Sequence, residues 1–184
     1  MHMEYFTAQK QHINLTDVEI SGRILDIGGG GEGVISRRYG GSVTAIDKRK
    51  DELEESPDFG LKVIMDAREL KFLDNYFGSI TCFYSLMYMG EEEVDKVLAE
   101  AYRVLAPKGS LWIWDTDMPY PSEADVFMVP LEVSLPNETI STTFGIAWRK
   151  SQSLDSVTQK CAAAGFTVIE SGASGQRFFL KLAK

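Results

Sequence analysis

The sequence predicts an α/β fold, a doubly wound and mostly parallel sheet with an antiparallel C-terminal edge strand. Strand-like and helix-like segments alternate from Arg23 to Asp115, which is typical of a parallel sheet covered by helices on both faces. Near the C-terminus, two strand-like segments are joined by so short a link, residues 171–176, that they must pair antiparallel. Two more strand-like segments, separated by a Pro- and Asn-bearing turn at 135–138, predict a β-hairpin arm inserted after strand five.

The elements of the first half are defined by apolar runs and by glycine and proline breakers. Gly40-Gly41 is a stop signal for one helix, and Pro57 breaks the next. The expected elements are a short N-terminal helix at 3–12, strands at 23–27, 43–46 and 61–65, and helices at 33–39 and 50–55.

The elements of the second half follow from the same signals. A helix with one apolar face is expected before a tight turn at Pro107-Lys108-Gly109, and a later helix ends at Gly165. The expected elements are strands at 77–84 and 110–114, hairpin strands at 126–134 and 139–149, helices at 91–105 and 154–164, and final strands at 166–170 and 177–182.

Length and composition favour one domain over residues 1–184, with residues 1–20 as an N-terminal arm and 120–150 as an inserted hairpin or lid. The net charge of −8 argues against a nucleic-acid partner, because phosphate contacts need a basic stripe. No apolar run is long enough to span a bilayer, and the N-terminus has no signal-peptide core. We therefore expect no membrane partner.

Cysteine and histidine content gives no indication of a metal site. Cys82 and Cys161 lie in apolar segments far apart, so we expect buried thiols rather than a disulfide. Free thiols are typical of a reducing compartment, so we expect a cytoplasmic location. His2 and His12 are too few for a metal site, and no metal is expected.

The most informative segment is the glycine-rich loop that follows the first strand. Asp26 ends the apolar run, glycines occupy positions 28–31, and Asp47 closes the second strand. Glycines let a backbone approach a ligand that a Cβ would block, and an acid at the end of the second strand can accept hydrogen bonds from ribose hydroxyls. The spacing of Gly28, Gly30 and Gly33 also fits G-x-G-x-x-G, the fingerprint of dinucleotide-binding proteins. Asp26 argues against that alternative, because a carboxylate at the end of the strand would repel a pyrophosphate.

Polar side chains follow each of the first five predicted strands. These residues are Asp26, Asp47, Asp66, Ser85 and Asp115. Because ligands bind outside the carboxyl ends of the strands in such sheets, we expect these side chains to converge on one rim.

Several motifs of the chain resemble those of class I S-adenosylmethionine-dependent methyltransferases. The first is Ile24–Gly30, and a later segment, Tyr102–Leu111, is similar to the family's helix–turn–strand segment. Phe77–Met89 resembles the fourth-strand motif, although Gly78 follows Phe77 where the family often has an acid. A further departure is Glu32, which stands where a glycine is expected.

The resemblance implies S-adenosylmethionine as cofactor and suggests how it is held. In the family, the glycine loop approaches the methionine and ribose, an acid matching Asp47 holds the ribose hydroxyls, and a pair matching Asp66-Ala67 recognises adenine. The residues predicted to bind the cofactor are Asp26, Gly28, Gly29, Gly30, Asp47, Asp66, Ala67 and Ser85. For Asp47 and Asp66 a helix- or turn-capping role is the alternative interpretation.

The function implied is methyl transfer to a small-molecule acceptor by in-line displacement. Such a reaction demands alignment rather than a particular catalytic residue, so Tyr88, Asp115 and Asp117 are only candidates for a base. The alternatives are a nicotinamide-dependent oxidoreductase and a cofactor-binding relative without activity. Apolar side chains of the arm are expected to form either a lid over the acceptor or a homodimer contact; they are Phe127, Met128, Leu131, Phe144 and Trp148.

Overall fold

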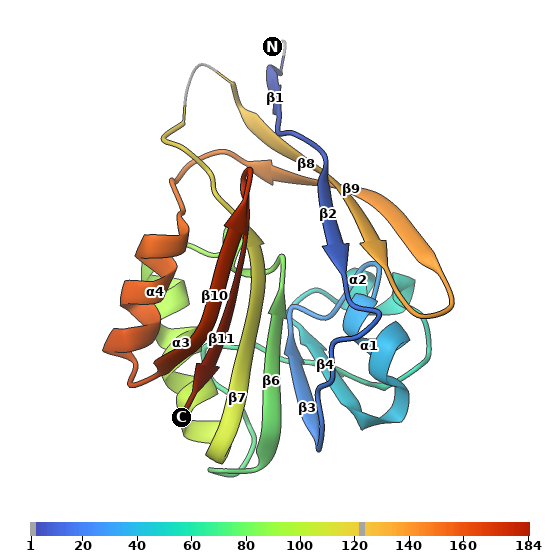
Figure 1. Ribbon diagram of the computed structural model, residues 1–184, viewed down its shortest axis with the longest axis vertical. Helices are drawn as coiled ribbons and strands as arrows, with labels where there is room; N and C mark the ends of the chain where they lie inside the picture. The colour runs from blue at the N-terminus through green and yellow to red at the C-terminus, as the bar shows by residue number, and fades with distance from the viewer. Residues whose placement is uncertain (1–2, 122–123) are drawn as a thin grey trace.

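The protein is built around a twisted seven-stranded sheet (Figure 1). The computed structural model describes residues 3–121 and 124–184, so His2 lies outside the described residues. The strand order is β10-β11-β7-β6-β3-β4-β5. Its strands are β3 (Ile24–Ile27), β4 (Val43–Asp47), β5 (Leu61–Ile64), β6 (Phe77–Phe83), β7 (Leu105–Thr116), β10 (Thr167–Ser174) and β11 (Arg177–Ala183).

The predicted mostly parallel sheet with an antiparallel C-terminal edge is confirmed. β3, β4, β5, β6 and β7 run parallel to their neighbours. β11 pairs antiparallel with β7 and lies between it and β10, the outermost strand. β10 is longer than the expected 166–170, so the link to β11 shrinks to a turn at Gly175-Gln176 in which Gly175 has φ of 58°.

The tight turn expected at Pro107-Lys108-Gly109 lies inside β7. The pairing of β6 with β7 shifts from Phe77–Leu105 to Ser79–Ser110, so the intervening residues bulge out of the ladder. Lys108 has φ of 65°, as in a turn. The turn chemistry was correctly recognised, but it bends a continuous strand instead of preceding a new one.

Helices cover both faces of the sheet, as Figure 1 shows. α3 (Glu91–Val104) and α4 (Leu154–Ala163) share one apolar core with the side chains of Leu25, Ile27 and Ile113. α1 (Val34–Tyr39) and α2 (Lys50–Glu55) lie on the other face. Two 3-10 turns, η1 (Gly40–Ser42) and η2 (Leu86–Tyr88), complete this set. In the described residues no helix is long and apolar enough to cross a membrane.

A second, smaller sheet lies beyond the carboxyl ends of β6 and β7 (Figure 1). It contains the hairpin strands β8 (Val126–Ser134) and β9 (Thr139–Ala147), which pair antiparallel. The other edge of β8 is occupied by β1 (Tyr5–Thr7) and β2 (Gln11–Asn14), which both run parallel to it.

The N-terminal helix expected at 3–12 is therefore wrong. Long-range pairing with β8 satisfies the backbone of this segment, and the ring of Phe6 stacks on that of Phe127 at 5.3 Å between centroids. Burial alternates along β2, with Gln11 and Ile13 buried, as a strand requires. The partner strand β8 lies more than a hundred residues away, so the local sequence carries no sign of it.

The apolar side chains of the arm mostly form the core between the two sheets. Phe127, Leu131 and Trp148 are buried in the same cluster as Val34 and Ile35 of α1. These three residues are therefore structural, and neither a free lid surface nor a dimer contact. The expectation of buried thiols is confirmed, because the cysteines at 82 and 161 are both buried and unbridged.

Candidate functional site

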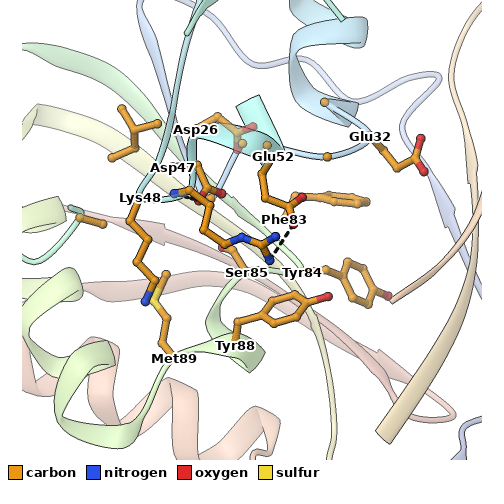
Figure 2. A pocket seen from close by; sticks show the side chains of 18 of the residues that line it. Asp26, Glu32, Asp47, Lys48, Glu52, Phe83, Tyr84, Ser85, Tyr88 and Met89 are labelled. Carbon is orange, nitrogen blue, oxygen red and sulfur yellow. Dashed lines mark hydrogen bonds and ion pairs between the residues drawn. The ribbon is translucent and has the colours of Figure 1, made fainter. Parts of the chain in front are cut away.

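A cavity of about 400 Å³ opens at the carboxyl ends of β3, β4, β5 and β6 (Figure 2). Every residue predicted to hold the cofactor lines it: Asp26, Gly28, Gly29, Gly30, Asp47, Asp66, Ala67 and Ser85. Its size falls within the range of small-molecule sites. The structure thus brings together segments that are widely separated in the sequence.

The glycine loop is packed too tightly for side chains. The N–H groups of Gly28 and Gly29 both donate to the carbonyl of Ile46, at 2.9 and 3.0 Å. A Cβ on Gly29 would lie 2.6 Å from Asp26 Oδ2, and one on Gly30 would lie 2.5 Å from the Cβ of Glu52. The protein's own neighbours therefore require these glycines, in addition to any ligand that approaches them.

Asp26 lies beneath this loop, not at the open end of the strand. It is buried, and its Oδ1 accepts a hydrogen bond from Thr81 Oγ1 at 2.7 Å. Burial raises the pKa of Asp26 to about 7, and the nearby charge of Asp47 adds to the effect. A cation bound above the loop would stabilise the ionised form.

Asp47 makes a local backbone contact and also faces the cavity. Its Oδ1 accepts the N–H of Arg49 at 2.9 Å, although the N-terminus of α2 itself has no side-chain cap. Its Oδ2 lies 3.1 Å from the position of a Cβ on Gly30 and so faces the loop. The carboxylate is thus anchored by one oxygen and presents the other to the cavity, beside Glu52, whose pKa is raised by desolvation, with a further contribution from Asp47.

Asp66 is engaged by Arg68. It accepts the Arg68 N–H at 2.9 Å and forms an ion pair with the guanidinium, with Nη2 at 2.6 Å. These bonds hold the pKa of Asp66 at about 2. Glu93 continues this rim of charges, with Lys48 Nζ at 3.2 Å and Arg68 Nε at 3.9 Å. The turn-capping alternative is realised, and an adenine amine would have to share the carboxylate with Arg68.

Ser85 presents a buried hydroxyl without a partner. Among the described residues, Ser85 Oγ forms no hydrogen bond, although Ser85 is only 5% exposed. Its Cβ lies 2.6 Å from the position of a Cβ on Gly28, so the hydroxyl is next to the glycine loop. An orphaned buried polar atom in a cavity indicates a missing hydrogen-bonding partner.

Aromatic side chains form the wall opposite the loop. Figure 2 shows Phe83, Tyr84 and Tyr88 around the part of the cavity below Glu52. Phe144 of β9 reaches the same wall, with its ring 5.8 Å from that of Tyr84. Sequence reasoning did not assign Glu52, Tyr84 or Phe144 to the cofactor site; an acid within α2 gives no signal of its own, and the contribution of β9 depends on the docking of the second sheet.

Two of the three candidate bases lie outside the cavity. Asp115 is fully buried, accepts the N–H of Met87 at 3.3 Å and Gln152 Nε2 at 3.0 Å, and burial raises its pKa to about 6. Asp117 Oδ1 accepts the Leu154 N–H at the start of α4. The expected convergence of strand ends is therefore wrong for Asp115, because its side chain turns inward and holds η2. Among the described residues, no group of three potential ligands is placed to bind a metal.

Comparison with known proteins shows what this fold resembles. Residues 25–113 match the family described as a methyltransferase domain. The resemblance seen in the sequence is thus confirmed over these residues, and the chain has the fold of solved S-adenosylmethionine-dependent methyltransferases. No curated protein matches the chain significantly.

Solved structures with this fold include proteins of different activities. A SAM-dependent methyltransferase from Methanosarcina mazei is 18% identical, with a TM-score of 0.61 over 88% of this chain and 91% of its own. The glycopeptide N-methyltransferase MtfA in complex with S-adenosylhomocysteine is 14% identical, with a TM-score of 0.60 over 90% and 82%. The [4+2]-cyclase SpnF is 17% identical, with a TM-score of 0.66 over 92% and 77%. At these identities the likeness concerns the fold.

Proposed function

We propose that this protein binds S-adenosylmethionine in the cavity and transfers its methyl group to a small-molecule acceptor. The observation that carries the proposal is the arrangement around the glycine loop: an anchored carboxylate at Asp47 with one free oxygen, and an orphaned hydroxyl at Ser85. These are hydrogen-bonding groups of the kind that a ribose and an amino acid moiety require. Complexes of MtfA with S-adenosylmethionine and S-adenosylhomocysteine support the choice of ligand.

Each predicted residue has a proposed task. Gly28, Gly29 and Gly30 let the methionine and ribose lie against the backbone, and Asp26 supports that loop from below. Asp47 accepts from the ribose hydroxyls, and Asp66-Ala67 recognises the adenine edge. Ser85 hydrogen-bonds to the part of the ligand nearest Gly28. Acidic groups around the loop favour a cationic ligand over a pyrophosphate, which disfavours the nicotinamide alternative.

Alignment and exclusion of water are the chemical work proposed for the protein. When bound, the cofactor supplies an electrophilic methyl on a sulfonium that is already a good leaving group. The aromatic wall of Tyr84, Tyr88 and Phe144 holds the acceptor in line with the methyl group and excludes water from it. Of the candidate bases, only Tyr88 lines the cavity, and it is half-exposed. Burial raises the pKa of Tyr88, so its hydroxyl stays protonated near neutral pH and cannot act as a base. We therefore propose that an acceptor that arrives protonated loses its proton to water.

The second candidate function is cofactor binding without methyl transfer. The observation that favours it is the cyclase SpnF, which shares this fold. Fold alone does not determine the reaction. The nicotinamide alternative has no such support.

Calorimetric titration of the purified protein with S-adenosylmethionine, S-adenosylhomocysteine and NADH tests the proposal. We expect micromolar binding of both adenosyl compounds and no heat from NADH. Binding of NADH, or of none of the three, would overturn the proposed cofactor. Transfer of radiolabelled methyl to an acceptor panel then separates the methyltransferase from the second candidate function.

A further inference from the structure

A buried polar chain joins the N-terminal strand to the wall of the cavity. Tyr84 donates its hydroxyl proton to Gln11 Oε1 at 2.5 Å, and Gln11 Nε2 donates to Thr116 Oγ1 at 2.7 Å. The Thr116 hydroxyl in turn donates to the carbonyl of Gln176 at 3.2 Å. The three side chains are almost fully buried, at 4% exposure for Gln11, 2% for Tyr84 and 0% for Thr116.

Only an amide at position 11 completes this chain in its direction. The carboxamide of Gln11 accepts from one neighbour with its oxygen and donates to the other with its nitrogen. Burial raises the pKa of Tyr84, so its hydroxyl remains a donor around neutral pH. Loss of Gln11 would leave that donor without a partner in the interior, where an unpaired polar group is destabilising.

The backbone conformation of Tyr84 links its hydrogen bond with Gln11 to the cofactor site. Tyr84 has φ of 49°, a left-handed conformation that is rare for an aromatic residue and persists only when the surroundings enforce it. Its N–H donates to the carbonyl of Trp114 at 2.7 Å, and its ring packs near that of Phe144. The chain turns here, and Ser85 is the next residue, with its unpartnered hydroxyl beside Gly28.

We infer that Gln11 is a positioning residue for the cofactor site: it holds Tyr84 in its strained conformation and thereby sets the place of Ser85. Gln11 lies on β2, outside the methyltransferase domain match, and it does not line the cavity. The N-terminal arm is thus part of the site's architecture. The inference rests on the proposed function, because its readout is affinity for the adenosyl ligand.

A double-mutant cycle separates positioning from a merely structural role. Gln11→Met removes the hydrogen bond that holds Tyr84 and should weaken S-adenosylhomocysteine binding about tenfold in calorimetry, a change of the order of one buried hydrogen bond. Tyr84→Phe removes the same hydrogen bond from its other end, so it should lose a similar factor, and the double variant should lose no more than either single variant. The matched control is Ile13→Ala, on the same face of β2, which should lower the melting temperature without changing affinity.

The outcomes distinguish the inference from the proposed function. If the wild-type protein does not bind S-adenosylhomocysteine, the proposed function and this inference both fall. If the wild type binds and folded Gln11→Met binds equally well, the inference alone is overturned. Additive losses in the double variant, or an equal loss of affinity in Ile13→Ala, would also overturn it, because either result shows a general structural effect.

Discussion

Replacing Asp26 by asparagine should make the stability of this protein less sensitive to pH. The pKa of Asp26 is raised from 3.8 to about 7, chiefly by burial. The folded state therefore holds the proton more tightly than the unfolded state does. The stabilisation that this proton gives is fully present below pH 3.8 and is lost as pH rises towards 7. An uncharged amide of the same shape avoids that loss and can still accept from Thr81.

The size of the effect follows from the pKa difference. One pKa unit corresponds to about 1.4 kcal/mol, so complete ionisation of the buried carboxyl lowers stability by about 4 kcal/mol. Between about pH 5 and about pH 8, the difference in unfolding free energy between Asp26→Asn and wild type should grow by about 3 kcal/mol in favour of the variant. Using the difference between the two proteins cancels the titration of all other groups.

Urea unfolding at the two pH values, followed by circular dichroism, measures this difference. A parallel titration with S-adenosylmethionine should show that wild-type affinity increases as pH rises through 7, because a cationic ligand favours the ionised carboxylate. The affinity of Asp26→Asn should be weaker and flat with pH. A stability difference that stays constant between the two pH values would refute the reasoning, since Asp26 would then not be ionising from a buried state.

Three further predictions concern the loop and the second sheet. Asp47→Ala should weaken S-adenosylhomocysteine binding at least about tenfold in calorimetry while the protein stays folded. Asp51→Ala, on the exposed side of α2, is the control, and equal affinities of the two variants would remove Asp47 from the site. Gly30→Ala should lower the melting temperature because its Cβ meets Glu52, whereas Gly172→Ala, with open space around it, should not, and identical melting curves would contradict the packing described. Phe127→Ala should lower the unfolding free energy by about 3–5 kcal/mol in urea, and a loss below about 1 kcal/mol would show that the second sheet is not packed on the core.

The parts of the fold that were predictable are those specified by local sequence. α2 is expected at 50–55 and is observed there, because Pro57 breaks a short polar segment. The glycine loop and its flanking acids were placed by spacing alone, and the structure brings them to one cavity. These signals lie within a few residues of each other, so no distant contact had to be known.

The parts that were missed depend on distant contacts. β1 and β2 are strands because β8 offers an edge to them, and their own sequence carries no such information. The sequence predicts Asp115 at a strand end like Asp26, but Asp115 lies within β7, where its contacts with the Met87 N–H and Gln152 hold it in the interior. Phe144 enters the cavity only through the docking of the second sheet.

The parallel pairing of β2 with β8 also has a consequence for the order in which the molecule forms. During synthesis the segment 11–14 emerges first, and its partner at 131–134 follows only after most of the main sheet has left the ribosome. Contacts so distant in sequence form slowly, because the chain loses the entropy of closing a long loop before the strands can form stabilising hydrogen bonds. The aromatic wall that contains Tyr84 and Phe144 is therefore completed late, after the glycine loop beneath it. A nascent chain arrested before Val126 would carry the loop but lack β8, β9 and the Phe144 side of that wall.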